Sequence, residues 1–307
     1  MYDIIVIGSI NMDVIVTCHE FPHSGDNSFC KSIQMTAGGK GNNQAVSAAR
    51  FGRKVCFIGC IGNDDTGRQL RQNLKKRKID DTYMIIKQGA ETGSCVGLLE
   101  PDGDNTLLVN TGANFAFGAE EVSDTLGKVQ GKILLIQMET SKESVLAAMR
   151  TGREKGMFII LDPAPVGGID TECFPYADLI VPNSSETKHI TGITVNDECS
   201  ALKAAKMIHA MGVKSVIIKM GGDGCLLYQG DMSVFIPALS VKAVDTLGAG
   251  DCFAGALASY LIDDTNNIEG ALRFAQIVAG IKVSRTGGHD AIPAMEEVSA
   301  VSERMSV

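Results

Sequence analysis

The chain has 307 residues, enough for one large α/β domain or two modest ones, and 45% of them are hydrophobic. Its net charge of −8, from 36 acidic and 28 basic residues, argues against non-specific binding to nucleic acid or to anionic membranes. No apolar run is as long as a membrane span, and nine scattered cysteines without a CxxC motif favour neither disulfides nor a zinc site, so we expect a protein of the reducing cytoplasm.

The chain begins with an apolar strand and not with a signal peptide. The predicted buried strands are Ile4–Ile7, Val55–Ile61, Ile133–Met138, Phe158–Leu161, Leu179–Val181 and Val216–Ile218. The predicted helices are Gly41–Phe51, Thr66–Arg77, Lys142–Lys155, Glu198–Met211, Gly250–Leu261 and Ile268–Ser284. Continuous apolar strands that alternate with helices predict a doubly wound, mainly parallel sheet with helices on both faces.

Three extended segments interrupt this alternation, at about 13–18, 28–36 and 92–110. The third is predicted to be a hairpin around the turn Pro101-Asp102-Gly103-Asp104. Strands without crossover helices predict a small separate sheet. We expect that sheet to be a lid over the active site of a single domain that spans residues 1–307.

The first glycine-rich segment, Ala37-Gly38-Gly39-Lys40-Gly41-Asn42-Asn43-Gln44-Ala45, opens a predicted helix. Its glycines permit close approach of a ligand to the backbone, and the first N–H groups of a helix are free to bind one. Lys40 adds a cation, and Asn43 adds a donor and an acceptor. The segment therefore predicts a site for a polyhydroxylated or phosphorylated ligand. It is not a P-loop, because no Gly-Lys pair in the chain is followed by Ser or Thr.

Two later segments follow predicted strands, at the ends where parallel sheets bind ligands. In Pro182-Asn183-Ser184-Ser185-Glu186, Asn183 is a candidate for a nucleotide phosphate and Glu186 for a metal-bound water. An ordinary N-cap with an acidic first turn explains both residues equally well. Lys219-Met220-Gly221-Gly222-Asp223-Gly224 is a candidate turn against a nucleotide, and a hairpin into Cys225–Tyr228 explains its glycines as well.

The fourth segment, Asp245-Thr246-Leu247-Gly248-Ala249-Gly250-Asp251, leads into an apolar helix. The N–H groups of Gly248, Ala249 and Gly250 are predicted to converge as an anion hole for a transferring phosphoryl group. Asp251 is the candidate catalytic base. A capping carboxylate is the alternative, but a cap does not require Gly-Ala-Gly in front of it. A free Asp has a pKa of about 3.9, so its task would be to orient a hydroxyl and accept the proton late.

The last segment, Arg285-Thr286-Gly287-Gly288-His289, ends the final predicted helix. The carbonyl groups there can attract a cation, and Asp245 can add a carboxylate, although a plain Gly287 cap explains the same residues. The histidines form no ligand pattern, and we expect most of them to be solvated.

Together with Gly8-Ser9-Ile10-Asn11-Met12-Asp13, the first and fourth segments resemble the ribokinase and phosphofructokinase-B family of sugar kinases. The resemblance spans nearly the whole chain in the right order, and the two signatures together are highly specific. It implies ATP-dependent phosphorylation of D-ribose at the 5-hydroxyl, Mg²⁺ with the ATP, an activating K⁺ or similar monovalent cation, and a homodimer formed through the lid.

The resemblance also implies roles for individual residues. The sugar would be held by Asn11, Met12, Asp13, Gly39, Lys40, Gly41, Asn42, Asn43, Glu139 and Asp251. ATP would be held by Asn183, Lys219, Met220, Gly221, Gly222, Asp223, Gly224, Gly250, Asp251 and Gln276. The monovalent cation would be held by the Asp245 side chain and by the carbonyl groups of Leu247, Lys282, Arg285 and Gly287, with Ala291 in place of a common Ser. Glu186 would hold Mg²⁺ through water.

Two positions bear on the specificity of this chain. Asn11 can pair with a 2-hydroxyl, whereas deoxyribose-specific members resemble Met there, so we predict D-ribose over 2-deoxyribose. Lys219 stands where Thr is frequent in the family, which predicts altered nucleotide contacts.

Three other functions were considered. A nicotinamide oxidoreductase is disfavoured, because Gly8-Ser9-Ile10-Asn11 lacks the GxGxxG pattern. A kinase of another sugar or nucleoside and a non-catalytic sugar-sensing module stay open, because a shared fold does not determine activity. A sensor needs no base, so Asp251 favours an enzyme.

Overall fold

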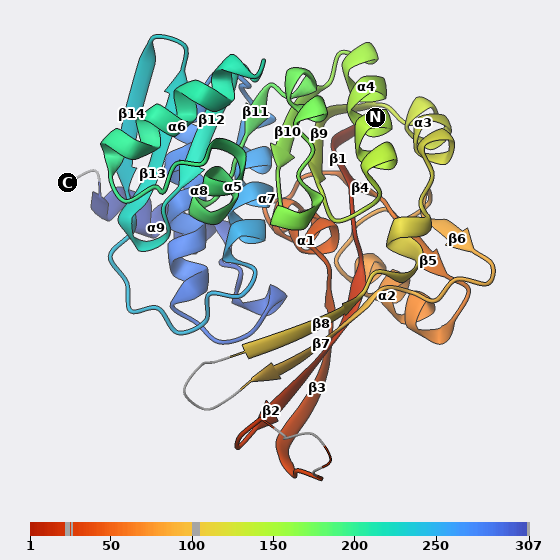
Figure 1. Cartoon of the computed structure of the whole chain (residues 1–307). Coiled ribbons are helices and arrows are strands. Elements are labelled where there is room, and N and C mark those ends of the chain that lie inside the picture. The colour runs from red at the N-terminus through yellow and green to blue at the C-terminus, as the bar shows by residue number, and fades with distance from the viewer. Residues whose placement is uncertain (22–24, 26, 100–104, 306–307) are drawn as a thin grey trace.

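The computed structural model describes residues 1–21, 25, 27–99 and 105–305. Its centre is an eight-stranded sheet in the order β14-β13-β12-β11-β10-β9-β1-β4 (Figure 1). In that order the strands are Met232–Pro237, Gly224–Gln229, Ser215–Lys219, Leu179–Ile180, Phe158–Asp162, Gly131–Gln137, Tyr2–Ile7 and Val55–Ile58. The strands from β12 to β4 are parallel, and β13 and β14 form an antiparallel edge. The predicted doubly wound, mainly parallel sheet is confirmed.

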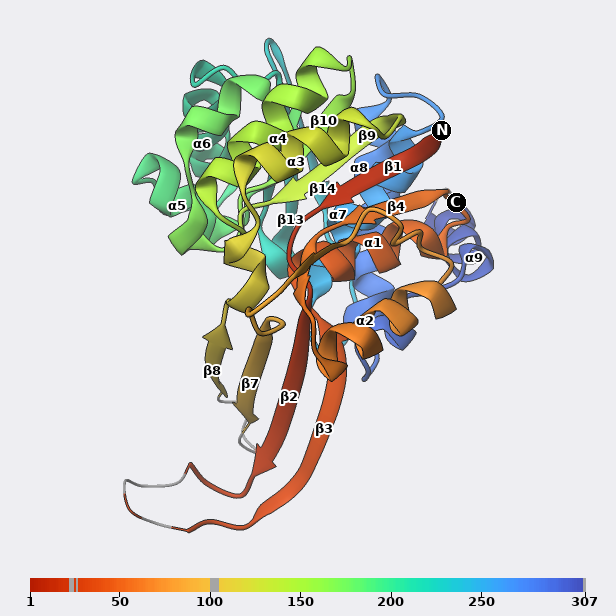
Figure 2. The ribbon, with the colours of Figure 1, turned by 90° about the vertical axis from the view of Figure 1, so that its right-hand side faces the viewer.

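Helices cover both faces of this sheet (Figures 1 and 2). Ile4 and Val6 of β1 belong to one hydrophobic cluster, and Ile5 and Ile7 belong to the other. The first cluster includes residues of α1 (Lys40–Arg50), α2 (Asp65–Lys76), α7 (Ala249–Leu261), α8 (Ile268–Val283) and α9 (Met295–Met305). The second includes residues of α3 (Ala119–Gly127), α4 (Lys142–Glu154) and α6 (Glu198–Ala210), with α5 (Ser184–Thr191) packed against it. Burial on both sides explains why the strands are continuous apolar runs.

The prediction of one strand over Val55–Ile61 is wrong. The run divides at Gly59 into β4 and β5 (Cys60–Gly62), and β5 leaves the main sheet to pair with β6 (Ile85–Lys87). A Cβ atom on Gly59 would lie 2.9 Å from the carbonyl oxygen of Gly8, so the close approach of these two backbone segments favours a glycine there. Apolarity did not distinguish the two strands, because both are buried. Helices α3, α5 and α9 and strands β6 and β14 were not among the predicted elements.

The predicted lid is a separate four-stranded sheet that projects from the α/β body (Figures 1 and 2). Its strand order is β3 (Cys30–Gly38), β2 (Asn11–Cys18), β7 (Ser94–Leu99) and β8 (Asn105–Asn110). At the end that meets the α/β body, β2 begins at Asn11, two residues before its predicted start, and β3 ends at Gly38, two residues after its predicted end. The predicted turn over 101–104 lies outside the described residues.

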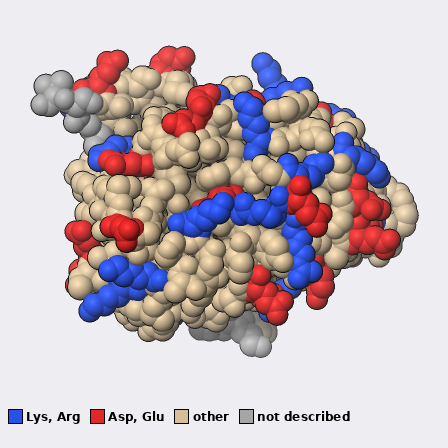
Figure 3. Space-filling view, turned by 90° about the horizontal axis from the view of Figure 1, so that it is seen from above, with Lys and Arg blue, Asp and Glu red and all other residues tan. Residues whose placement is uncertain are grey.

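Two surface properties complete the fold. Within the described ranges, no helix is both long and apolar enough to cross a bilayer. On the face seen from above in Figure 3, on the side of the body away from the lid, Lys and Arg side chains alternate with Asp and Glu side chains.

Candidate active site

The floor of the candidate site is formed where β1 and β2 meet the start of α1. Gly39 caps α1 with a φ of 86°, and a Cβ atom there would lie 2.8 Å from the Cα of Ile10. A Cβ atom on Gly41 would lie 2.7 Å from the carbonyl carbon of Gly8. The two glycines therefore let the first turn of α1 lie directly against the backbone of residues 8–10.

Polar side chains converge on this floor. The carboxylate of Glu139 accepts a hydrogen bond from the backbone N–H of Lys40 at 3.0 Å and another from the Ser9 hydroxyl. The buried Asn11 is oriented by Asn114, whose Nδ2 donates to its Oδ1 at 2.7 Å. That bond leaves the amide NH₂ of Asn11 as the donor available to a ligand.

Asp251 lies in the first turn of α7, only 6% exposed. Nδ2 of Asn43 donates to one of its carboxylate oxygens at 3.0 Å, and Nε2 of Gln44 donates to the other at 3.1 Å. Burial raises the pKa of Asp251, and the charge of Lys40 and these two hydrogen bonds oppose that shift. The result is a positioned carboxylate with greater proton affinity than a solvated one.

Asp13, on β2, is a second carboxylate of this site. Burial, with the nearby charges of Glu139 and Asp251, raises its pKa to about 7. Its Oδ1 is buried and has no hydrogen-bond partner among the described residues. A Cβ atom on Gly38 would lie 1.9 Å from its Oδ2, so a larger residue at position 38 would displace this carboxylate. An unpartnered buried acceptor of this kind is suited to a ligand hydroxyl.

Two lysines balance the acidic groups. Burial opposes the charged form of Lys40, but its pKa is raised overall because Asp251, Asp162, Glu139 and Glu186 surround it. Lys219, at the end of β12, forms an ion pair with Asp162 at 3.0 Å. Its pKa is likewise raised: burial opposes the charged form, and Asp162 and Glu186 favour it. Both ammonium groups are therefore charged at neutral pH.

Lys219 also lies beside the start of α7. A Cβ atom built on Gly250 would lie 3.6 Å from its Nζ. Gln44 connects the two regions, because its Nε2 donates to Asp162 at 2.8 Å as well as to Asp251. The base and the lysine thus belong to one hydrogen-bonded group.

The predicted anion hole differs from expectation at one donor. Gly248 adopts a φ of 71° and caps α7. The N–H of Ala249 donates to the carbonyl of Thr246 at 3.2 Å, so the turn already uses it. Within the described part of the chain, the N–H groups of Gly248, Gly250 and Asp251 donate to no acceptor. These are the amides that the helix start offers to an anion.

Asn183 and Glu186 form a capping box at the start of α5. The N–H of Glu186 donates to Asn183 Oδ1 at 2.9 Å, and the N–H and Nδ2 of Asn183 donate to the Glu186 carboxylate at 2.7 and 2.8 Å. The structure therefore bears out the N-cap interpretation of this segment. Over the described ranges, no three His, Cys, Asp or Glu side chains are grouped to hold a metal ion.

The candidate nucleotide loop joins β12 to β13 as a single helical turn, Gly221–Asp223. Gly224 adopts a φ of 129°, and a Cβ atom there would lie 2.3 Å from the carbonyl oxygen of Ile236. Met220 is buried, and Gln276 of α8 reaches the same carbonyl of Ile236 through its Nε2 at 3.4 Å. The structure thus brings the loop and Gln276 together at one edge of the sheet, next to β14. The hairpin that explains the glycines is present as β12 and β13, which pair antiparallel across this turn.

Two of the residues expected to bind a monovalent cation, Asp245 and Leu247, contact an ammonium group of the protein itself. Nζ of Lys282 donates to the carbonyl of Leu247 and to that of Asp245, the latter at 3.1 Å, and lies 3.8 Å from Asp245 Oδ1. The carbonyl of Lys282 accepts a hydrogen bond from the N–H of Arg285 at 3.2 Å. As arranged, these oxygens do not fit a second cation, because the ammonium holds two of them. Gly287 has a φ of 106°, and Ala291 is buried nearby in the turn His289–Ala291.

Four residues of the site were not singled out from the sequence: Gln44, Asn114, Asp162 and His289. Gln44 belongs to the first glycine-rich segment. Asp162 ends a buried parallel strand, and ligands bind at the carboxyl ends of such strands, which is the reasoning that identified Asn183. His289 is half-buried, and its Nε2 lies 2.7 Å from Asn43 Oδ1. Burial, reinforced by Arg77, lowers its pKa to about 4, so the neutral ring donates to Asn43. His289 is therefore an exception to the expectation that most histidines are solvated.

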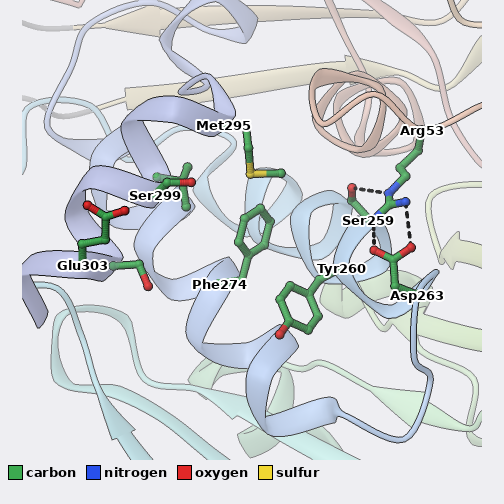
Figure 4. A pocket seen from close by; sticks show the side chains of 10 residues that line it. Arg53, Ser259, Tyr260, Asp263, Phe274, Met295, Ser299 and Glu303 are labelled. Carbon is green, nitrogen blue, oxygen red and sulfur yellow. Dashed lines mark hydrogen bonds and ion pairs between the residues drawn. The ribbon is translucent and has the colours of Figure 1, made fainter. Parts of the chain in front are cut away.

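A hollow between α7, α8 and α9 lies elsewhere (Figure 4). Its lining includes Arg53, which forms an ion pair with Asp263 at 2.5 Å, and Tyr260 and Phe274. At a rise of about 1.5 Å per residue, Asp251 and Tyr260 are about 14 Å apart along the axis of α7. This hollow is therefore not part of the site around Asp251.

Comparisons with known proteins agree with this geometry. The model of the pfkB family of carbohydrate kinases matches residues 1–295. A ribokinase from Haemophilus influenzae is 33% identical over 293 residues, covering 95% of each chain. A deoxyribokinase from Salmonella typhi is 31% identical, covering 96% of this chain and 97% of its own. The structure of an Arabidopsis thaliana ribokinase complexed with ribose and ATP has a TM-score of 0.88 and 27% identity, covering 98% of both chains.

Proposed function

The chain belongs to the pfkB family of carbohydrate kinases, and we propose that it transfers the γ-phosphoryl group of ATP to the 5-hydroxyl of D-ribose. The products are ADP and D-ribose 5-phosphate. The proposal is supported by the ribokinases among its relatives and by the ribose and ATP in the Arabidopsis thaliana structure.

One observation carries the proposal most directly. The buried Asp251 carboxylate is held by Asn43 and Gln44 in the same helical turn whose open N–H groups belong to Gly250 and Asp251. A proton acceptor and an anion site are therefore adjacent. Transfer of a phosphoryl group to a hydroxyl needs both.

The reaction would proceed as follows at these atoms. The 5-hydroxyl oxygen attacks the γ-phosphorus, and the bond to the bridging oxygen of ADP breaks. Asp251 orients the hydroxyl and takes its proton as the new P–O bond forms. The open amides and Lys219 face the negative charge that develops on the phosphoryl oxygens. Holding the two reactants in line supplies most of the rate.

Mg²⁺ is proposed to arrive with ATP. The described residues hold no metal-binding cluster, which suits an ion carried mainly by phosphate oxygens and water. The Glu186 carboxylate, which is itself part of the capping box, is the proposed partner for such a water. Bound in this way, Mg²⁺ would neutralise charge on the phosphates of the nucleotide.

The sugar is proposed to lie between the lid and α1. Asp13, Asn11 and Glu139 present acceptors and donors there, as expected for a ligand rich in hydroxyls. 2-Deoxyribose is the second candidate sugar, because a deoxyribokinase is among the relatives. Asn11 favours ribose, since its free amide donor would lose a partner with a sugar that lacks the 2-hydroxyl.

A homodimer through the lid is also proposed. The strand register places Met35, Val14, Val96 and Leu108 in one row across all four strands. Met35 and Leu108 are 64% and 63% exposed, so the row is an apolar face open to a partner. Asp13 alternates with Val14 along β2 and therefore points to the opposite face, toward the site. Two copies of the apolar face can cover each other across a two-fold axis.

The experiment that tests the proposed function measures ADP release with a panel of sugars for the wild type and for Asp251→Asn. We expect D-ribose to give the highest kcat/KM. The variant should lose about a thousandfold in kcat while ribose still binds with a similar Kd, because a positioned proton acceptor contributes about 10² to 10⁴ in rate. Near-normal turnover in the variant would remove Asp251 from the reaction.

A further inference from the structure

Lys282 stands out among the buried residues of the protein. Its side chain is only 2% exposed, although lysine is almost never buried without a partner. It extends from the last turn of α8 into the loop that precedes α7, and its partners are oxygens of residues 245–247.

These oxygens form a cage around one positive charge. Two are backbone carbonyls, of Asp245 and Leu247, and the third belongs to the Asp245 carboxylate, 3.8 Å away. An ammonium group has three donors and no acceptor, so it suits a set of oxygens. The cage has the chemistry of a monovalent cation site, and a side chain of the protein occupies it.

The cage also fixes the backbone that leads to the anion site. The N–H groups of Val244 and Asp245 both donate to the carbonyl of Val283, at 2.7 and 3.1 Å. Asp245 Oδ1 accepts from the N–H of Leu247 at 3.0 Å. Leu247 immediately precedes Gly248, the cap of α7, so the ammonium lies behind the turn that presents the Gly250 and Asp251 amides.

We infer that Lys282 is a tethered replacement for an activating monovalent cation and that this enzyme works without added K⁺. This inference rests on the proposed kinase function for its activity readout. Lys282 is a positioning residue: it holds the 245–248 backbone and thereby the anion site, and it touches neither sugar nor nucleotide.

The first test needs no variant. The wild type is assayed in buffers whose monovalent cation is either K⁺ or bulky tetramethylammonium. We expect kcat and the KM for ATP to agree within about twofold between the two buffers, because the Lys282 side chain occupies the cage in both. Activation by K⁺ of about tenfold or more would overturn the inference.

The second test removes the ammonium. Lys282→Ala opens a space at the cage, and we expect its kcat in tetramethylammonium to fall about tenfold or more and to recover with K⁺ or NH₄⁺. Lys242→Met, at an exposed lysine of the same loop, is the matched control and should behave like the wild type. A Lys282→Ala enzyme that stays folded and is equally active in both buffers contradicts the inference.

A measurement of stability tests the role of Lys282 independently of the proposed kinase activity. Thermal unfolding of Lys282→Ala should shift to higher temperature with K⁺, whereas the wild type should not respond. If no sugar is phosphorylated, the proposed function fails, and this shift still decides the role of Lys282. A K⁺-dependent shift in the wild type, or none in the variant, would overturn that role.

Discussion

The protonation of Asp13 predicts how sugar binding depends on pH. The pKa of this carboxyl group is raised to about 7 in the free protein, first by burial and then by Glu139 and Asp251. A hydroxyl donates to the ionised carboxylate, so the sugar prefers the deprotonated form. Because the proton must leave first, binding should strengthen as pH rises through 7.

The magnitude follows from that pKa. The apparent Kd is the limiting Kd multiplied by one plus 10 raised to (pKa − pH). With a pKa of about 7, the Kd for D-ribose should be about tenfold weaker at pH 6 than at pH 8. An ordinary Asp, with a pKa of about 3.9, would give no change over this range.

The assay is calorimetric titration of the nucleotide-free protein with D-ribose at several pH values. Asp13→Asn should bind more weakly at pH 8 and lose the pH dependence. Asp231→Asn, at an exposed position, is the control and should retain it. A wild-type Kd that is flat between pH 6 and 8, or one that strengthens toward pH 6, refutes the reasoning.

Three further predictions concern other parts of the site. Lys219→Met should raise the KM for ATP about tenfold and leave the Kd for ribose unchanged, because the ammonium group faces the anion site and not the sugar. Initial-rate kinetics measures the KM and calorimetry measures the Kd, and an unchanged KM for ATP would contradict the prediction. The kcat/KM for D-ribose should exceed that for 2-deoxyribose about a hundredfold, and Asn11→Met should narrow the ratio; comparable wild-type values would count against Asn11 as the reader of the 2-hydroxyl. Gly41→Ala should lower the free energy of unfolding, measured in urea, by about 1–3 kcal/mol, since its Cβ would meet the Gly8 backbone. Gly222→Ala has open space around it and should lower the free energy of unfolding by less. Equal effects of the two substitutions would contradict the close approach of Gly41 to Gly8.

The main sheet could be predicted from the sequence because its strands are buried on both faces and are separated by amphipathic helices. The lid could be predicted because its strands lack crossover helices. The division at Gly59 could not be predicted, since both strands are equally apolar and the approach of the Gly8 backbone to Gly59 appears only in the folded structure.

The candidate site could be predicted where glycines adjoin polar residues in one segment, as around Asn43 and Asp251. Contacts between distant segments could not be predicted in this way. The ion pair of Lys219 with Asp162 joins residues 57 positions apart, and the contact of His289 with Asn43 joins residues 246 apart. The course of the Lys282 side chain was also missed, because the expected cation ligand there was its carbonyl.

The central claim is transfer of phosphate from ATP to the 5-hydroxyl of ribose at Asp251. Proton-coupled ³¹P NMR of the product made from D-ribose and ATP tests it most directly. We predict a monoester signal split by the two protons on C5, formed by the wild type and not detectably by Asp251→Asn over the same period. A signal split by a single sugar proton, as for a phosphate on C1, or the same product from the variant, would contradict the account.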